Sequence, residues 1–279
     1  MTEPAAASDE RPPRRLTPFL PTRQHRRFVE FADAVRRHRY IGACYGAPGI
    51  GKTLSARTYA AADDLDRWTE DRFKRSAVLP AALLASRTAM LTPGVTTTPR
   101  ELETQIFNRC VGLGAEIART LRPDISPELS RESPLGLELL IIDEADRLKT
   151  AGLELVRDYF DTSDDIGVVL IGMPGFERRL ARYPQLYSRV GFAHHYRPLD
   201  STDIPQVLAQ YWQQLGKTYD PQRSTDSESI VTIIRITGGN FRLVERLMNQ
   251  VARIMTISNL DTITPDAIEA AREVLVVGA

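Results

Sequence analysis

YIGACYGAPGIGKTLSARTYA, residues 40–60, is the stretch that decides the fold. Its first part, Tyr40–Tyr45, is a short apolar run that predicts a buried strand. A loop with three glycines follows, and after the loop comes a helix. Strand, glycine-rich loop and helix in this order form the context that a phosphate-binding loop requires. The stretch therefore predicts an α/β fold built around a phosphate site.

The loop carries the P-loop pattern, Gly46-x4-Gly51-Lys52-Thr53. Glycines let backbone N–H groups curl around phosphate oxygens, and the helix N-terminus adds positive potential. In this pattern Lys52 reaches the β and γ phosphates, and Thr53 is a ligand of Mg²⁺. The alternative, a glycine-rich turn without function, is disfavoured by the flanking strand and helix. The predicted ATP-binding residues are Gly46, Ala47, Pro48, Gly49, Ile50, Gly51, Lys52, Thr53 and Leu54.

A second apolar run ends in acidic residues, in LELLIIDEAD at residues 137–146. Two carboxylates at the end of a buried strand are costly unless a cation lies close to them. We predict that Asp143 holds Mg²⁺ through water and that Glu144 orients and activates the attacking water. Acids that merely end a strand are the plainer alternative, and the P-loop earlier in the chain disfavours it. A DEAD-box helicase is excluded by length, because it needs a second α/β domain.

Two arginines are candidates for further contacts with the nucleotide. Arg189 lies between the apolar run 168–171 and a last predicted strand, 192–197. In a multimeric ATPase an arginine there reaches the γ-phosphate of the neighbouring subunit and stabilises charge in the transition state. Arg242 opens a predicted helix and would touch the nucleotide of its own chain. For both arginines, a solvated surface position remains the alternative.

The amino-acid composition limits the kinds of partner and cellular location that we expect for this protein. Lysine plus arginine and aspartate plus glutamate number 36 each, so the formal net charge is zero and no global field attracts nucleic acid. Two cysteines without a CxxC pair argue against a disulfide framework and a structural zinc site. The N-terminus has no apolar segment, and no run of 18 apolar residues occurs anywhere. We expect a cytoplasmic protein that makes no membrane contact.

Strands and helices alternate up to about Pro198, which predicts a three-layer fold with a mainly parallel sheet covered on both faces. Thr22 is placed to cap a first helix, and Thr98-Pro99-Arg100-Glu101 opens another that runs to about Cys110. After Pro198 only helices are predicted, at about 202–215, 227–236, 241–256 and 265–275. The predicted domains are a flexible basic arm, 1–16, an α/β nucleotide-binding domain, 17–198, and a helical domain, 199–279.

Five segments together resemble the AAA+ ATPases of DNA transposition, the TniB, TnsC and MuB group: GAPGIGKT, LLIIDEAD, VVLIGMPGFERRL, QLYSRV and TGGNFR. The resemblance implies a P-loop AAA+ α/β sheet with a small all-helical lid domain. It implies a homo-oligomer, a ring or helical filament on double-stranded DNA, which recruits or activates a transposase and works with a target-selection protein. By the same match Arg189 is the arginine finger and Arg242 the second sensor.

One position departs from the family pattern. The strand before Met173-Pro-Gly ends in Gly172 and Met173, where AAA+ proteins usually place a polar first-sensor residue that helps to orient the lytic water. The departure predicts slow hydrolysis, which suits a switch that stays on DNA while ATP is bound.

Other interpretations share the nucleotide motifs. A helicase loader or initiator would bind a helicase rather than a transposase, and a signalling switch would use ATP without touching DNA. Arginines before residue 40 are either a solvated face or phosphate contacts: Arg11, Arg14, Arg15, Arg23, Arg26, Arg27, Arg36, Arg37 and Arg39. Further candidates for DNA contact are Lys74, Arg75 and Arg87.

Overall fold

The computed structural model describes residues 19–72, 78–124, 136–163 and 166–275. These residues form two compact units. Within the described residues, the α/β unit comprises Thr22–Leu199 together with Asn240–Arg242, and the helical unit comprises Asp200–Gly239, 243–275 and 19–21. The predicted arm, residues 1–16, and the candidates Lys74 and Arg75 lie outside the described residues.

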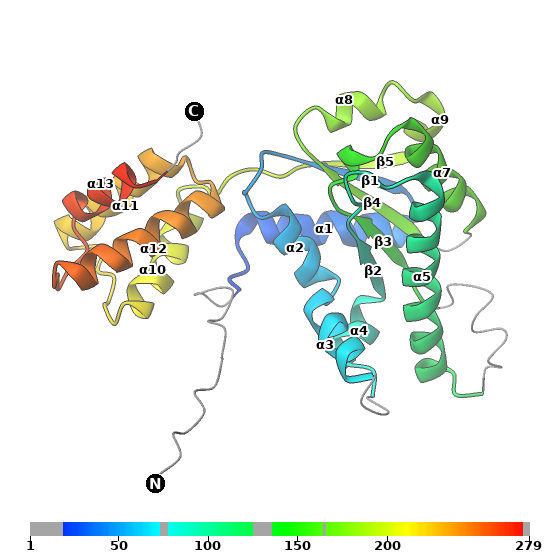
Figure 1. Ribbon diagram of the computed structural model, residues 1–279, viewed down its shortest axis with the longest axis horizontal. Coiled ribbons are helices and arrows are strands. Elements are labelled where there is room, and N and C mark those ends of the chain that lie inside the picture. The colour runs from blue at the N-terminus through cyan, green and yellow to red at the C-terminus, as the bar shows by residue number, and fades with distance from the viewer. Residues whose placement is uncertain (1–18, 73–77, 125–135, 164–165, 276–279) are drawn as a thin grey trace, which may run out of the picture. The chain divides into compact units, whose positions relative to one another are not determined.

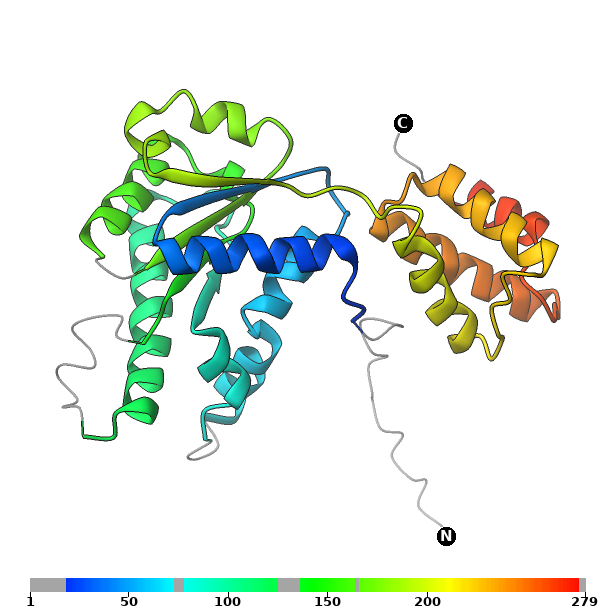
Figure 2. The same cartoon turned by 180° about the vertical axis from the view of Figure 1, so that it is seen from behind.

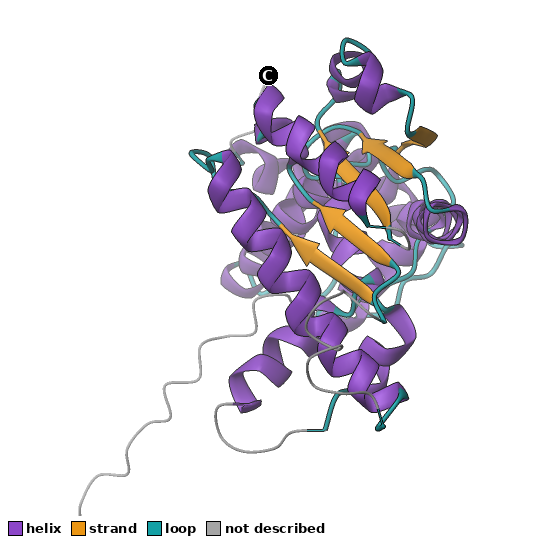
Figure 3. Ribbon diagram, turned by 90° about the vertical axis from the view of Figure 1, so that its right-hand side faces the viewer, coloured by secondary structure: helices purple, strands orange, loops and turns teal. Residues whose placement is uncertain are grey.

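The α/β unit is built on a five-stranded sheet with the order β2-β3-β4-β1-β5. Each neighbouring pair is parallel, and the arrows in Figure 3 accordingly point the same way. The strands are β1 (Ile41–Tyr45), β2 (Thr88–Leu91), β3 (Leu139–Ile142), β4 (Gly167–Gly172) and β5 (Val190–His195). This sheet, with helices on both faces, is the P-loop AAA+ α/β fold expected from the sequence.

Side chains alternate between two buried layers along each central strand, as the two-residue period of a strand requires. Cys44, Ile141 and Val169 pack with helices α1 (Arg23–His38) and α2 (Lys52–Tyr59) in one layer. The other layer contains the alternate strand residues and side chains of α5 (Pro99–Leu121) and α7 (Thr150–Thr162). Shorter helices complete this unit: α3 (Ala62–Arg72), α4 (Ala81–Ser86), α8 (Phe176–Leu180) and α9 (Pro184–Tyr187), together with a 3-10 turn at Ala145–Arg147 (Figure 1).

Helix α1 lies across the sheet, as Figure 2 shows from behind the view of Figure 1. Thr22 caps it as predicted, because its hydroxyl accepts a hydrogen bond from the His25 N–H at 3.3 Å. Phe28, Phe31 and Val35 are buried against the strands. The helix approaches β1 so closely at Gly42 that no side chain fits between them. A glycine in β1 therefore sets how near α1 lies to the sheet.

Glu138 is the common partner of three arginines that lie at the end of α1 and before β2. Glu138 pairs with both Arg36 and Arg87. Arg39 donates hydrogen bonds to the carbonyl oxygens of Arg36, at 2.9 Å, and Glu138, at 3.0 Å. The guanidinium of Arg87 fixes the start of β3 in this arrangement, and its contact with DNA stays a prediction.

Several predicted boundaries differ from the structure. Helix α5 begins with the predicted capping box at Thr98 and Glu101 but continues to Leu121 instead of ending near Cys110. Burial of Leu113 and Ile117 on the same face offsets the low helix propensity of the intervening glycines. Strand β5 begins two residues before the predicted start.

The helical unit consists of α10 (Asp203–Gln214), α11 (Ser224–Thr237), α12 (Phe241–Ile257) and α13 (Pro265–Glu273). These match the four predicted helices within a few residues. Val244, Met248 and Val251 on α12 are buried, as the three- and four-residue spacing predicts. No helix in the part of the chain that the structure describes is both long and apolar enough to cross a membrane.

Gly42→Ala tests the contact between α1 and β1. A Cβ at residue 42 would lie 2.4 Å from a methyl carbon of Val35 and 2.7 Å from the ring of Phe31. The clash should lower the free energy of unfolding, measured by urea denaturation, by about 1–3 kcal/mol. Gly112→Ala in α5 is the matched control: its Cβ meets nothing within 4 Å, so it should raise stability by up to about 1 kcal/mol. Equal losses in both variants would contradict this account.

Candidate nucleotide-binding site

The loop between β1 and α2 has a backbone that only glycine adopts without strain at two positions. Gly49 has φ +78° and Gly51 has φ +107°, both in the left-handed region. Gly51 is also the residue before the first turn of α2, so the N–H groups at the start of that helix face the loop. Ile50 is buried and anchors the loop to the core. The loop thus has the geometry of an anion-binding cradle.

Tyr196 supports this loop, although the sequence analysis did not identify it. A Cβ on Gly46 would lie 2.3 Å from the carbonyl oxygen of Tyr196, so only glycine fits there. The phenol group of Tyr196 shares a buried hydrogen bond of 2.8 Å with Ser55 in α2. Its N–H donates to the carbonyl oxygen of Tyr45 at 2.9 Å. Tyr196, which directly follows β5, therefore contacts β1, the loop and α2 and holds the three together.

The ammonium group of Lys52 lies inside the loop. Its Nζ donates to the carbonyl oxygens of Gly46, at 2.6 Å, and Ala47, at 2.8 Å. The residue is only 8% exposed. Burial lowers the pKa of Lys52 from its ordinary value, while the negative charges of Asp143 and Asp146 act in the opposite direction.

Asp143 follows β3 directly, and the structure brings it to Thr53 at the start of α2. The Thr53 hydroxyl is near enough to its carboxylate to lower the pKa of Asp143. The carboxylate also accepts from the N–H of Glu144 at 2.9 Å. Burial raises the pKa of Asp143 above its ordinary value, and the Thr53 hydroxyl and the bond from Glu144 oppose that shift. The two predicted Mg²⁺ ligands are therefore neighbours, although they are far apart in the sequence.

Glu144 has a left-handed backbone, with φ 52°, between β3 and the 3-10 turn. Its carboxylate forms an ion pair with Arg147. Arg147 also donates to the carbonyl oxygen of Pro93 at 2.9 Å, in the segment after β2. The predicted water-activating residue is therefore held by an arginine that the sequence analysis did not single out. The signal in the sequence for this ion pair is the spacing of Glu144 and Arg147, which are three residues apart and so lie one turn from each other.

The end of β4 has no room for a polar sensor side chain. A Cβ on Gly172 would lie 2.6 Å from the ring of Phe176. Met173 follows the strand and is 38% exposed. Because β4 lies between β1 and β3, this end of the strand is at the same sheet edge as the P-loop and Asp143.

Residues 240–242 belong to the same compact unit as the P-loop. The side-chain amide of Asn240 donates to the carbonyl oxygen of Pro48 at 2.8 Å. The backbone N–H of Arg242 donates to the carbonyl oxygen of Gly49 at 2.9 Å. The positive charge of Arg242 is near enough to lower the pKa of Lys52. Arg242 is thus positioned beside the loop, with its side chain exposed.

Arg189 is not part of this group. Its carbonyl oxygen accepts from the N–H of Ile41 at 3.0 Å, at the amino end of β1, whereas the P-loop follows the carboxyl end. The five residues of β1 alone separate those ends by about 13 Å at about 3.3 Å per residue. That distance exceeds the reach of an arginine side chain, so Arg189 cannot serve the loop of its own chain in this conformation.

The donor chemistry fits Mg-ATP. A buried ammonium, two left-handed glycines and the start of a helix suit phosphate oxygens. A threonine hydroxyl near a buried carboxylate is the donor set typical of Mg²⁺ in P-loop proteins. Leu54 follows in the first turn of α2 and is half-buried.

Comparisons with known proteins agree with this geometry. Residues 35–180 match the family described as AAA domain, a range that contains the P-loop, Asp143 and Glu144 but ends before Arg189. A protein of Staphylococcus aureus described as "Potential ATP-binding protein" is 38% identical over 277 residues, covering 93% of this chain and 97% of that protein.

Solved structures with a similar fold include the RuvB Holliday junction branch migration motor of Thermotoga maritima. It has a TM-score of 0.56 at 16% identity, over 90% of this chain and 68% of that one. The ORC1 protein of Aeropyrum pernix in complex with DNA has a TM-score of 0.55 at 17% identity, over 92% of this chain and 66% of that one. At such identities the likeness establishes the fold alone.

The lowered pKa of Lys52 predicts a pH dependence of nucleotide affinity. The ammonium is charged below its pKa, so affinity for ATP should be constant while the pH stays well below that pKa. It should fall by up to about tenfold per pH unit once the pH rises above that pKa. Titration calorimetry with ATP from neutral to alkaline pH measures the effect. Lys52→Arg, whose guanidinium does not titrate in this range, should remove the dependence; the same alkaline loss in that variant would assign it to another group.

Proposed function

The chain belongs to the AAA domain family, and on that basis we propose that it is an ATP-hydrolysing, DNA-binding regulator of DNA transposition, similar in kind to TniB, TnsC and MuB. Its subunits assemble on double-stranded DNA when ATP is bound, and the assembly recruits or activates a transposase. One observation carries the proposal: the P-loop and Asp143 lie at one edge of the sheet, while Arg189 is at the other edge and half-exposed.

The roles of the residues follow from their chemistry. Lys52 binds the β and γ phosphates, and the N–H groups of the loop and of α2 bind the remaining phosphate oxygens. Thr53 and Asp143 are the residues that would hold Mg²⁺, which neutralises phosphate charge when bound. Glu144 orients and activates the attacking water after its carboxylate leaves Arg147. Arg242, beside Gly49, contacts the nucleotide of its own chain.

Slow hydrolysis is part of the proposal. The ring of Phe176 occupies the space beside Gly172, so the end of β4 provides no polar side chain to orient the lytic water. Fewer groups that position the water mean a higher barrier. A slow ATPase keeps its ATP, and therefore its assembly, on DNA for longer.

DNA contact requires a local basic surface because the net charge is zero. Helix α1 supplies exposed arginines for this purpose: Arg23, Arg26, Arg27 and Arg37. Arg36 and Arg39 are left out of this set because they are only partly exposed and lie against Glu138. Contacts of this kind release counterions, so affinity for DNA should fall steeply as the salt concentration rises.

A helicase loader or initiator is the second candidate. It shares every nucleotide motif with a transposition regulator, so the match to the AAA domain family supports both equally. The two differ in the partner that the assembled protein binds. An ATP-dependent switch that never binds DNA is the third candidate. Assembly on DNA in the presence of ATP separates it from the other two.

ATP-dependent assembly on DNA is the central test. Electron microscopy and fluorescence anisotropy with labelled duplex DNA would compare protein without nucleotide, with ATP and with a non-hydrolysable analogue. We expect rings or filaments on DNA only with nucleotide, and loss of both in Lys52→Ala. Glu144→Gln should keep assembly and lower the rate of hydrolysis by about 10²–10⁴-fold, because a general base is removed while the binding groups remain.

The partner decides between the candidates. Adding a candidate transposase should raise the yield of strand transfer in the presence of the assembled protein and ATP. Assembly on DNA without any effect on strand transfer would favour the loader or initiator. A protein that binds ATP yet remains monomeric and ignores DNA would leave only the switch.

A further inference from the structure

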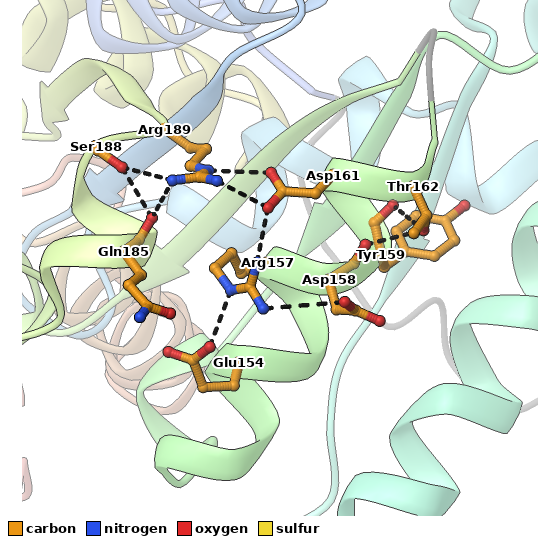
Figure 4. A network of polar contacts seen from close by, with 9 residues as sticks. All are labelled: Glu154, Arg157, Asp158, Tyr159, Asp161, Thr162, Gln185, Ser188 and Arg189. Atoms are coloured by element: carbon orange, nitrogen blue, oxygen red, sulfur yellow. Dashed lines mark hydrogen bonds and ion pairs between the residues drawn. The ribbon is translucent and has the colours of Figure 1, made fainter.

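The arginine proposed to act in the neighbouring site is already bound within its own chain. The guanidinium of Arg189 makes a two-pronged contact with the Asp161 carboxylate, at the end of α7 (Figure 4). Its Nε lies 3.0 Å from one carboxylate oxygen and its Nη2 lies 2.9 Å from the other. Such fork-to-fork pairs are the strongest and most directional contacts that arginine makes with a carboxylate.

Further bonds occupy the rest of the guanidinium. Its Nη1 donates to the carbonyl oxygen of Gln185 at 3.0 Å and to the hydroxyl of Ser188 at 2.8 Å. Four of the five N–H groups of Arg189 therefore have acceptors within the chain. The edge that faces Asp161, formed by Nε and Nη2, is one of the edges through which arginine binds a phosphate in a two-pronged way. A phosphate can bind at that edge only by replacing Asp161.

Asp161 is itself fixed in place. Arg157, one turn earlier on α7, donates to the same carboxylate at 2.7 Å and is held by Glu154 at 2.9 Å. The hydrogen bond from Arg189, assisted by Arg157, keeps the pKa of Asp161 below its ordinary value. The side chain of Asp161 is 28% exposed and that of Arg189 is 37% exposed. The pair is therefore ordered, yet close enough to solvent to open.

We propose that Asp161 is a positioning residue that stores the Arg189 guanidinium in the free subunit and yields it to the γ-phosphate of ATP on a neighbouring subunit during assembly. The inference rests on the proposed role of Arg189. The exchange replaces one anion by another, so the guanidinium is never left without a counter-charge. The anion that displaces Asp161 must bind more strongly than a single carboxylate.

This storage sets a threshold for assembly. A phosphate of low charge competes poorly with a carboxylate that is already oriented by Arg157. A triphosphate held on the P-loop of another subunit carries more charge and is itself positioned, so it displaces Asp161 once the subunits meet. The contact therefore favours assembly with the ATP-bound subunit over premature contact between Arg189 and other anions.

Asp161→Asn tests the proposal by removing the charge while keeping the shape. It should lower the protein concentration at half-maximal ATPase activity by about two- to fivefold, the range expected for an exposed ion pair. The turnover rate per subunit at saturating protein should not change, since Arg189 then contacts ATP in both proteins. Asp158→Asn is the matched control: this carboxylate lies on the same helix, 3.9 Å from Arg157, and among the described residues it makes no contact with Arg189.

Each outcome decides the matter. Asp161→Glu should restore most of the wild-type concentration dependence, and the effect of Asp161→Asn should shrink in an Arg189→Lys background, where the fork is absent. The storage role is overturned if Asp161→Asn matches Asp158→Asn, or if it lowers turnover at saturating protein. If Arg189→Ala leaves turnover unchanged in a chain that hydrolyses ATP, the finger role of Arg189 fails, and the storage role fails with it.

Discussion

The structure depends on two opposite charges, Lys52 and Asp143, buried at one edge of the sheet. Each charge alone would be expensive to bury, and each is made tolerable by the other and by its hydrogen bonds. This requires β1 and β3 to end at the same edge with β4 between them. Gly42 against α1 and Glu138 at the opposite edge fix those strands. The packing of the whole α/β unit thus holds a buried ammonium and a buried carboxylate at the same edge of the sheet, near enough for each charge to shift the pKa of the other.

The remaining charges proposed to take part in hydrolysis are engaged in the same way. Glu144 is paired with Arg147, and Arg189 is paired with Asp161. A charged group that already has a partner changes partner at low cost, because only the difference between the two interactions counts. A chain that holds its reactive charges with counter-ions is therefore stable without nucleotide, and it responds to an anion that competes for them.

The local parts of this arrangement are predictable from sequence, and the long-range parts are not. The P-loop, the strand that ends at Asp143 and the cap at Thr22 each depend on residues within a few positions of one another. The position of β4 between β1 and β3 leaves no mark in any single segment. Arg87 looks like a free cation in the sequence because Glu138, its partner, lies 51 residues away. Tyr196 and Asp161 were missed for the same reason.

The placement of Arg189 constrains any assembly in which it serves ATP. Its strand begins at the edge opposite the P-loop, so it can reach only the nucleotide of another chain. One subunit then contributes its P-loop edge and the next contributes its Arg189 edge, which is a head-to-tail contact between different surfaces. Contacts of this kind cannot stop at a symmetric dimer: they close into a ring or continue as a helix, depending on the rotation between neighbours. A ring or a helix is therefore the kind of assembly that the proposed role of Arg189 requires, by the same geometry that separates the arginine from its own loop.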